Sequence, residues 1–250
     1  MKNKILIISL AAIIMAAAAC TNSGKNDSST PSGNETASEN KKTEKATSES
    51  LPSDNEEITG TIAGNINLEK FIESQSKSTV TVSRFCYTIG KFEELQSQIA
   101  VKPEGAAMMV MIAMMIYQEY PMEGMKCLSA ACTAPLTSKS DDPGNYKGEK
   151  MNNVSTLKRN LTDYPRLPFI YFQGANPDNG YVPSGPPYQA KMYTNPYSYN
   201  KAGDGLRIKI YVETKGADSN RPCTVKKVGN IYKATEFSSL YLAYKPLNTQ

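Results

Sequence analysis

The sequence contains no histidine and no tryptophan among its 250 residues, and neither sign of charge dominates, since 28 Lys and Arg residues accompany 24 Asp and Glu residues. Histidine is the commonest general base in hydrolases and the commonest metal ligand, so Ser-His-Asp triads and histidine-containing zinc sites are excluded. The Walker A, Gly-x-Gly-x-x-Gly, Gly-x-Ser-x-Gly and His-Glu-x-x-His motifs are also absent. No catalytic motif therefore assigns a reaction to this chain.

Neither of the two long apolar runs is long enough to cross a membrane as a helix. Residues 106–117 contain five methionines and no charge, but twelve helical residues rise only ~18 Å against a hydrocarbon core of about 30 Å. Apolar residues cover every face of this predicted helix, which is typical of a buried one. Thioether sulfur is a ligand for Cu(I), yet histidine and paired cysteine partners are missing here. We therefore interpret the methionines as core packing and predict no metal site.

The other apolar run, residues 5–19, has the features of a secretory signal peptide. Lys2 and Lys4 precede it, and Ala17, Ala18 and Ala19 lead directly into Cys20. Small residues immediately before a cysteine resemble the lipobox of bacterial lipoproteins. That resemblance implies cleavage before Cys20 and its acylation by fatty acids such as palmitate, whereas an ordinary secretory signal is the alternative. We expect a lipid-anchored, extracytoplasmic protein, on the outer membrane if the cell has two membranes, because no Asp follows Cys20.

Composition then divides the chain into three parts. Residues 1–19 form the predicted signal peptide. Residues 20–57 form a predicted disordered tether, with four lysines, eight acidic residues and almost no large apolar side chains. Residues 58–250 carry 22 basic and 16 acidic residues and are long enough for a single domain with a sizeable core. The basic residues form no run or stripe, and an exported protein meets little nucleic acid, so we predict no nucleic-acid partner.

Four cysteines remain after Cys20, namely Cys86, Cys127, Cys132 and Cys223. An even number outside the cytoplasm permits two disulfides in three connectivities, and free or structural thiols are the alternative. The spacing between Cys127 and Cys132 matches no zinc pattern, so no metal and no cofactor are predicted.

Periodicity predicts an α+β domain with N-terminal helices, including the methionine-rich one, packed on a C-terminal antiparallel sheet. Helical spacing or start signals predict helices within 65–77, 90–100, 103–119, 121–133 and 149–161. Alternation predicts strands within 78–89 and 206–214 and a hairpin over 223–237 that turns at Gly229 and Asn230. Seven prolines between 164 and 199 predict a long irregular segment with neither continuous helix nor central strand.

Several motifs in the second half occur together in order: YFQGANPDNGYVPSGPPY, TNPYSY, VETKGADSNRPCTVKKVGNIY and FSSL. Together they resemble an uncharacterised family of bacterial proteins, a domain of unknown function that often follows a lipobox or a short tether. The family usually has tryptophan near the final hairpin, where this chain has Tyr232. The resemblance indicates which family the domain belongs to, but it implies no activity.

The segment 164–199 also contains seven tyrosines, which suit sugars and extended peptides because each ring has an apolar face and a polar tip. The alternative is that these rings simply complete the core or cover the sheet. The predicted ligand-binding residues combine the tyrosines with nearby arginines: Tyr171, Tyr181, Tyr188, Tyr193, Tyr197, Arg207 and Arg221.

Three hypotheses for function follow. The first is a non-enzymatic, membrane-tethered binding module for an extracytoplasmic glycan or peptide. The second is a histidine-free enzyme that uses carboxylates, since two acids suffice for glycoside hydrolysis. Its candidate residues are scattered along the chain: Glu119, Asp163, Asp178, Asp204 and Glu213. The third is a structural component of an envelope assembly with a protein partner.

Overall fold

The computed structural model describes residues 51–142 and 145–248. The predicted signal peptide 1–19, Cys20 and tether residues 21–50 lie outside the described residues. None of the helices within the described ranges is long and apolar enough to span a membrane.

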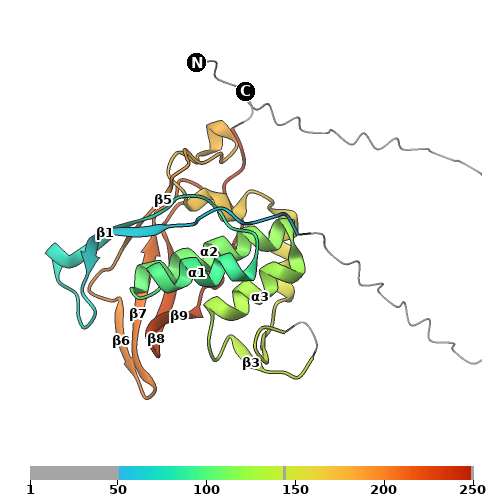
Figure 1. Cartoon of the computed structure of the whole chain (residues 1–250). Coiled ribbons are helices and arrows are strands. Elements are labelled where there is room, and N and C mark those ends of the chain that lie inside the picture. Colours follow the sequence, from blue (N-terminus) through green and yellow to red (C-terminus); the bar gives the residue numbers. More distant parts are fainter. Residues whose placement is uncertain (1–50, 143–144, 249–250) are drawn as a thin grey trace, which may run out of the picture. The chain divides into compact units, whose positions relative to one another are not determined.

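Within the described ranges, seven strands form one antiparallel sheet in the order β1-β2-β5-β7-β8-β9, and β6 pairs with part of β7 (Figure 1). A separate two-stranded sheet pairs β3 with β4. The strand bounds are β1 (Gly60–Ile66), β2 (Ser76–Val82), β3 (Thr137–Lys139), β4 (Glu149–Met151), β5 (Tyr188–Tyr193), β6 (Tyr199–Ala202), β7 (Gly205–Val212), β8 (Arg221–Val228) and β9 (Ile231–Glu236).

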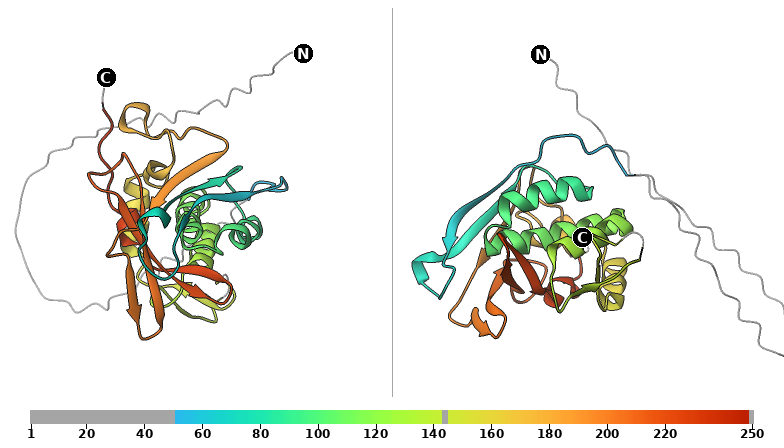
Figure 2. Two further views of the ribbon diagram at one scale, coloured as in Figure 1. Left: turned by 90° about the vertical axis from the view of Figure 1, so that its left-hand side faces the viewer. Right: turned by 60° about the horizontal axis from the view of Figure 1, so that its bottom comes forward.

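The helices pack against one face of the large sheet, as Figures 1 and 2 show from three directions. The α-helices are α1 (Ile89–Ile99), α2 (Pro103–Glu119), α3 (Pro121–Ala131) and α4 (Ser155–Asp163). Short 3₁₀ turns η1 (Glu73–Gln75), η2 (Leu167–Tyr171) and η3 (Pro177–Asn179) lie in connections between these elements, and η4 (Ser238–Tyr241) follows β9. The α+β prediction is confirmed.

The methionine-rich helix α2 is the centre of the core. Every residue from Pro103 to Ile116 is buried, including five methionines. The helix contacts α1 and α3, strands of the sheet, and η2 and α4. Unbranched methionine side chains fit the irregular gaps between so many different neighbours. The prediction of a buried helix rather than a membrane span is confirmed.

Two sequence predictions about the fold were wrong. Residues 65–77 form no α-helix, because they end β1 and turn into β2, with Asn67 Oδ1 accepting hydrogen bonds from the backbone N–H groups of Glu69 and Lys70. Within the proline-rich segment, β5 is a central strand between β2 and β7. Its six residues contain no proline, so the prolines flank the strand without interrupting it.

Other predictions need smaller corrections. The helix predicted within 149–161 begins only at Ser155, because Glu149–Met151 pairs with β3. The hairpin of β8 and β9 around Gly229 and Asn230 is confirmed. Cys86, Cys127, Cys132 and Cys223 are all buried free thiols.

The last residues of the predicted tether contact the folded part through Arg84. Its guanidinium donates to Asp54 Oδ1 at 2.6 Å, to the Glu57 carbonyl at 3.1 Å, and to the Glu56 carbonyl. The other Asp54 oxygen accepts from the Tyr87 N–H at 2.8 Å. Burial opposes ionisation of Asp54, yet these hydrogen bonds and the Arg84 charge lower its pKa. The chain is therefore held to the domain before β1 begins.

Candidate functional site

The sheet opens where β5 and β7 separate. The two strands pair only through Met192 with Val212 and Tyr193 with Tyr211, and one further bond joins the Glu213 N–H to the Lys191 carbonyl at 2.9 Å. Beyond that bond, β5 continues beside β2 while the chain after β7 turns toward β8. The wedge between the diverging strands is closed at its far side by residues 170–175.

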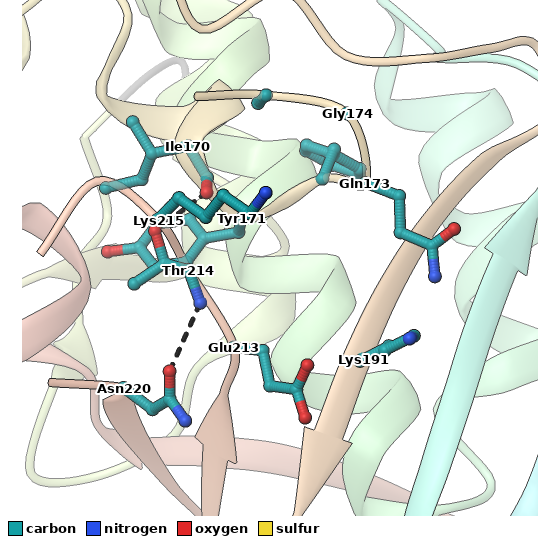
Figure 3. A pocket seen from close by; sticks show the side chains of 11 residues that line it. Ile170, Tyr171, Gln173, Gly174, Lys191, Glu213, Thr214, Lys215 and Asn220 are labelled. Atoms are coloured by element: carbon teal, nitrogen blue, oxygen red, sulfur yellow. Dashed lines mark hydrogen bonds between the residues drawn. The ribbon is translucent and has the colours of Figure 1, made fainter. Parts of the chain in front are cut away.

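A cavity of about 420 Å³ fills this wedge (Figure 3). Ligand pockets usually occupy a few hundred to about 1,000 Å³, so the volume suits one small molecule or a few units of a polymer. Figure 3 shows Glu213 and Lys191 next to each other on neighbouring strands, with Gln173 and Asn220 on either side. The lining residues are Ile170, Tyr171, Phe172, Gln173, Gly174, Ala175, Lys191, Glu213, Thr214, Lys215 and Asn220. We call this space the wedge cavity.

Hydrogen bonds hold the wall of the wedge cavity. The Thr214 hydroxyl donates to the Ile170 carbonyl at 2.7 Å and accepts from the Gly216 N–H at 2.9 Å. Asn220 Oδ1 accepts from the Thr214 N–H at 3.3 Å (dashed in Figure 3), and Asn220 Nδ2 donates to the Tyr193 hydroxyl at 3.3 Å. The wall is therefore bonded directly to the strand that carries Tyr193.

The loop that closes the cavity requires glycine at position 174. Gly174 has a φ of +88°, a conformation that residues with a Cβ rarely adopt. A Cβ there would also lie 2.0 Å from Ser184 Oγ and 2.6 Å from its backbone nitrogen. The close approach to Ser184 is held by a 2.7 Å bond from the Ser184 N–H to the Gln173 carbonyl.

The outer face of the sheet, opposite the helices, continues from the wedge cavity. On β7, Ile208, Ile210 and Val212 are buried, so Arg207, Lys209 and Tyr211 point to the other side. Tyr211 stacks on Tyr193 of β5, with ring centres 5.2 Å apart and 17° between the ring planes.

Three lysines surround this tyrosine pair. Lys77 of β2 lies directly opposite Tyr193, Lys191 precedes Tyr193 by two residues, and Lys209 precedes Tyr211 by two residues. Lys77 and Lys191 are exposed and Lys209 is partly exposed. None of the three has an acidic partner within ion-pair distance among the residues that the structure describes. Their positive charge is therefore available to a ligand.

A second cavity of about 480 Å³ lies at the other end of β7. It is lined by Pro196, Tyr197, Ser198, Tyr199, Asn200, Arg207, Lys209, Thr224, Thr235 and Glu236, and we call it the hairpin cavity. Tyr197 is 85% exposed, yet its turn is well ordered, because Asn195 Oδ1 accepts from the Tyr197 N–H at 2.9 Å. An aromatic ring held out into solvent on a hydrogen-bonded turn is a typical recognition feature.

The seven predicted ligand-binding residues do not form one cluster. Tyr193, Tyr197 and Arg207 lie on the outer face or in the hairpin cavity. The Tyr171 and Tyr181 rings are buried, and their hydroxyls donate to the carbonyls of Leu240 and Lys245.

The last two predicted residues also serve the domain's own packing. The Tyr188 ring stacks on Phe85 with centres 3.8 Å apart. Arg221 donates to the carbonyls of Ser239 and Ala243, which ties β8 to the C-terminal segment.

Besides Glu213, five polar residues of the wedge cavity were missed from the ligand-binding set: Gln173, Lys191, Thr214, Lys215 and Asn220. Glu213 was considered only as one of several scattered acids. The alternation along β7 could have identified Glu213 as a site residue, because it puts Glu213 on the same face as Arg207, Lys209 and Tyr211. Nothing local could reveal Gln173 or Asn220, because other strands bring them to the cavity.

The carboxylates of the described residues are spread over separate sites. Glu213 is the one acid that lines the wedge cavity, and Glu236 is the one acid that lines the hairpin cavity. Glu104, in the first turn of α2, is fully buried, and burial raises its pKa. The described residues contain no group of three or more His, Cys, Asp or Glu side chains that could hold a metal. Neither the wedge cavity nor the hairpin cavity contains the carboxylate pair that glycoside hydrolysis needs.

Residues 84–248 match the family described as Domain of unknown function (DUF6935). The chain belongs to the DUF6935 family. The matched region begins at Arg84, so it contains both cavities' walls on β5 to β9 but leaves β1 and β2, with Lys77, outside. No curated protein and no solved structure matches the chain significantly. Membership in DUF6935 therefore gives the domain an identity without an activity.

Proposed function

We propose that this DUF6935 protein is a non-enzymatic binding module, tethered to a membrane through lipid on Cys20, that holds an extracytoplasmic glycan or peptide on the outer face of its sheet. The observation that carries this proposal is the wedge cavity beside the stacked Tyr193–Tyr211 pair. It is a polar cavity of suitable volume, next to partly exposed aromatic rings on the same sheet face.

The polar groups of the wedge cavity suit a ligand rich in hydroxyl or amide groups. Lys191 and Lys215 supply donors, Glu213 supplies acceptors, and Gln173 and Asn220 can each do both. Because neither Glu213 nor Lys191 forms an ion pair with any residue in the described part of the chain, neither has to give up a charged partner when a ligand binds.

The same features argue against catalysis. A single carboxylate in the cavity can orient a ligand but lacks the second acid for a two-carboxylate mechanism. Glu213 and Lys191 are also exposed, whereas catalytic acids are usually tuned by burial or by close charged neighbours. The geometry therefore favours binding over the histidine-free enzyme.

The membrane part of the proposal rests on sequence. The charged start, the apolar run and the small residues before Cys20 are those of a lipoprotein signal. It is tested by growing cells with a labelled fatty acid and isolating the full chain. Label should appear in the native protein and be absent from Cys20→Ala, and equal labelling of both would contradict the anchor.

The binding part is tested with full-length protein in detergent on glycan and peptide arrays, followed by calorimetry with the best ligand. Lys191→Ala and Glu213→Gln should each weaken binding by roughly tenfold, as expected when a polar anchor is removed from a site. Lys158→Ala, an exposed lysine on α4, is the matched control and should bind like the native protein.

Two results would contradict the wedge cavity as the binding site. One is a ligand whose affinity is the same for Lys191→Ala, Glu213→Gln and the control. The other is turnover of the ligand during the titration, which would restore the enzyme hypothesis.

A further inference from the structure

The wedge cavity and the hairpin cavity lie along one strand. Glu213, just after β7, lines the wedge cavity, Tyr211 belongs to the stacked pair, and Lys209 and Arg207 line the hairpin cavity. These four side chains are alternate residues of one extended segment, so they all point to the outer face. Nothing in the sequence of β7 interrupts this row.

We infer that the two cavities are the ends of one binding track, and that its ligand is a linear acidic oligosaccharide. This inference rests on the proposed binding function. From Arg207 to Glu213 is six residues, which spans ~20 Å in a strand. A ligand that reaches both cavities must therefore be an extended chain, since a compact small molecule fills only one of them.

The charges along the track favour an acidic ligand. Three lysines along the track, Lys77, Lys191 and Lys209, have no acidic ion-pair partner in the described part of the chain. Lys191 shares the wedge cavity with Glu213, and Lys209 shares the hairpin cavity with Glu236. Arg207 is different, because Asp204 already binds it at 3.0 Å and also binds Lys226. The three lysines outnumber these two acids, so the track carries a net positive charge that attracts negative groups on a polymer.

The backbone favours a glycan over a peptide. Peptides that lie along a sheet commonly add a strand to a free edge. β7 has no free edge along the track, since its backbone pairs with β5 and β6 on one side and β8 on the other. Only side chains face the ligand, and the exposed ring of Tyr197 together with the Tyr193–Tyr211 pair offers apolar surfaces for sugar rings.

The test uses full-length protein and oligogalacturonides as probes: a disaccharide, a tetrasaccharide and a hexasaccharide. The same oligomers with methyl-esterified carboxyl groups are the uncharged controls. We expect affinity to rise by about tenfold or more from disaccharide to hexasaccharide, to fall with added salt, and to be lost on esterification.

Two variants locate the ends of the ligand. Lys191→Ala changes the wedge cavity and Tyr197→Ala changes the hairpin cavity, and both side chains are exposed, so neither substitution removes core packing. Each substitution should lower the affinity for the hexasaccharide by roughly tenfold, whereas only one of the two should lower the affinity for the disaccharide. Val101 is 47% exposed and lies between α1 and α2. Val101→Ala is therefore the control, and it should change the affinity for neither oligosaccharide.

Each of the other possible results of this experiment contradicts one part of the inference. If affinity is independent of length and Tyr197→Ala has no effect while Lys191→Ala does, the continuous track is wrong and the binding function stands. If the esterified oligomers bind equally well, or if an acidic peptide binds and the oligogalacturonides do not, the acidic glycan is wrong. If no glycan or peptide of any kind binds, the proposed function fails as well.

Discussion

Glu104 offers a quantitative test of how the core of this fold is built. Its side chain is fully buried at the start of α2, and neither carboxylate oxygen has a hydrogen-bond partner among the described residues. The nearby Ser78 hydroxyl is also buried and makes no hydrogen bond there. The helix dipole favours a negative charge at this position by about 0.3–2 kcal/mol, but burial of an unpaired carboxylate costs several kcal/mol. Burial therefore dominates, and it raises the pKa of Glu104 above its ordinary value of 4.5.

The sign of the pH dependence follows from this shift. Below the pKa that Glu104 has in the unfolded state, its carboxyl group is neutral in both the folded and the unfolded state. Ionisation of Glu104 then does not lower the free energy of unfolding. As pH rises toward the raised folded pKa, the unfolded state releases a proton that the folded state retains, so the native protein loses about 1.4 kcal/mol per pH unit. Glu104→Gln has no proton to lose and escapes this effect. The variant should therefore match the native protein in acid and exceed its stability by about 1–3 kcal/mol at neutral pH.

Chemical denaturation of both proteins across the pH range measures this difference directly. Glu69→Gln, at an exposed turn between β1 and β2, is the control and should show a flat difference. A difference between Glu104→Gln and the native protein that stays constant with pH, or that favours the native protein at neutral pH, would refute the reasoning about burial.

Three further predictions concern packing and the chain's attachments. Met111→Asp, at a fully buried position, should unfold the domain or cost on the order of 4–5 kcal/mol, whereas Val101→Asp at an exposed site should stay within about 0.5 kcal/mol in thermal denaturation. Gly174→Ala should cost about 1–3 kcal/mol because of its positive φ and the contact with Ser184, whereas Gly203→Ala meets open space, so equal melting temperatures would contradict this. Asp54→Asn should cost about 3 kcal/mol at neutral pH by leaving Arg84 without its buried partner. Since the pKa of Asp54 is lowered, that cost should shrink as pH falls below its ordinary value of 3.8, and denaturation that is equally affected at all pH values would count against the ion pair.

Local patterns were sufficient to predict much of this fold. The spacing of Phe92, Leu95 and Ile99 marks α1, the unbroken apolar run marks α2 as buried, and strict alternation marks β7. In each case, neighbours in sequence report the period of the element, and the period needs no knowledge of the partner.

The errors lie where the partner decides the structure. The stretch from Asn65 to Lys77 has apolar residues at helical spacing, but pairing of β1 with β2 outweighs this weak preference. The short strand β5 is hidden between prolines, and its central place depends on β2, which lies more than 100 residues earlier in the sequence. Strand pairing over such separations leaves little local signal.

The same reason explains how the site was only partly predicted. Tyr193, Tyr197 and Arg207 were chosen for their chemistry, and the structure places them on the outer face or in the hairpin cavity. Tyr171 and Tyr181 have the same chemistry, but their rings are buried and their hydroxyls bond to backbone carbonyls. A wedge between two diverging strands exists only in three dimensions, and composition cannot distinguish a tyrosine that faces solvent from one that completes the core.

The attachment of residues 54–57 to Arg84 has a mechanical consequence. β1 is an edge strand, and its first residue, Gly60, pairs with Val82, the last residue of β2. A pull on the N-terminal side would peel such a strand away one hydrogen-bonded pair at a time, beginning at Gly60. Arg84 lies just beyond that first pair and holds the preceding chain through Asp54 and two backbone carbonyls, so a load has to break a buried ion pair before it reaches the sheet. If the chain is anchored by Cys20, this arginine is the point that bears the tension.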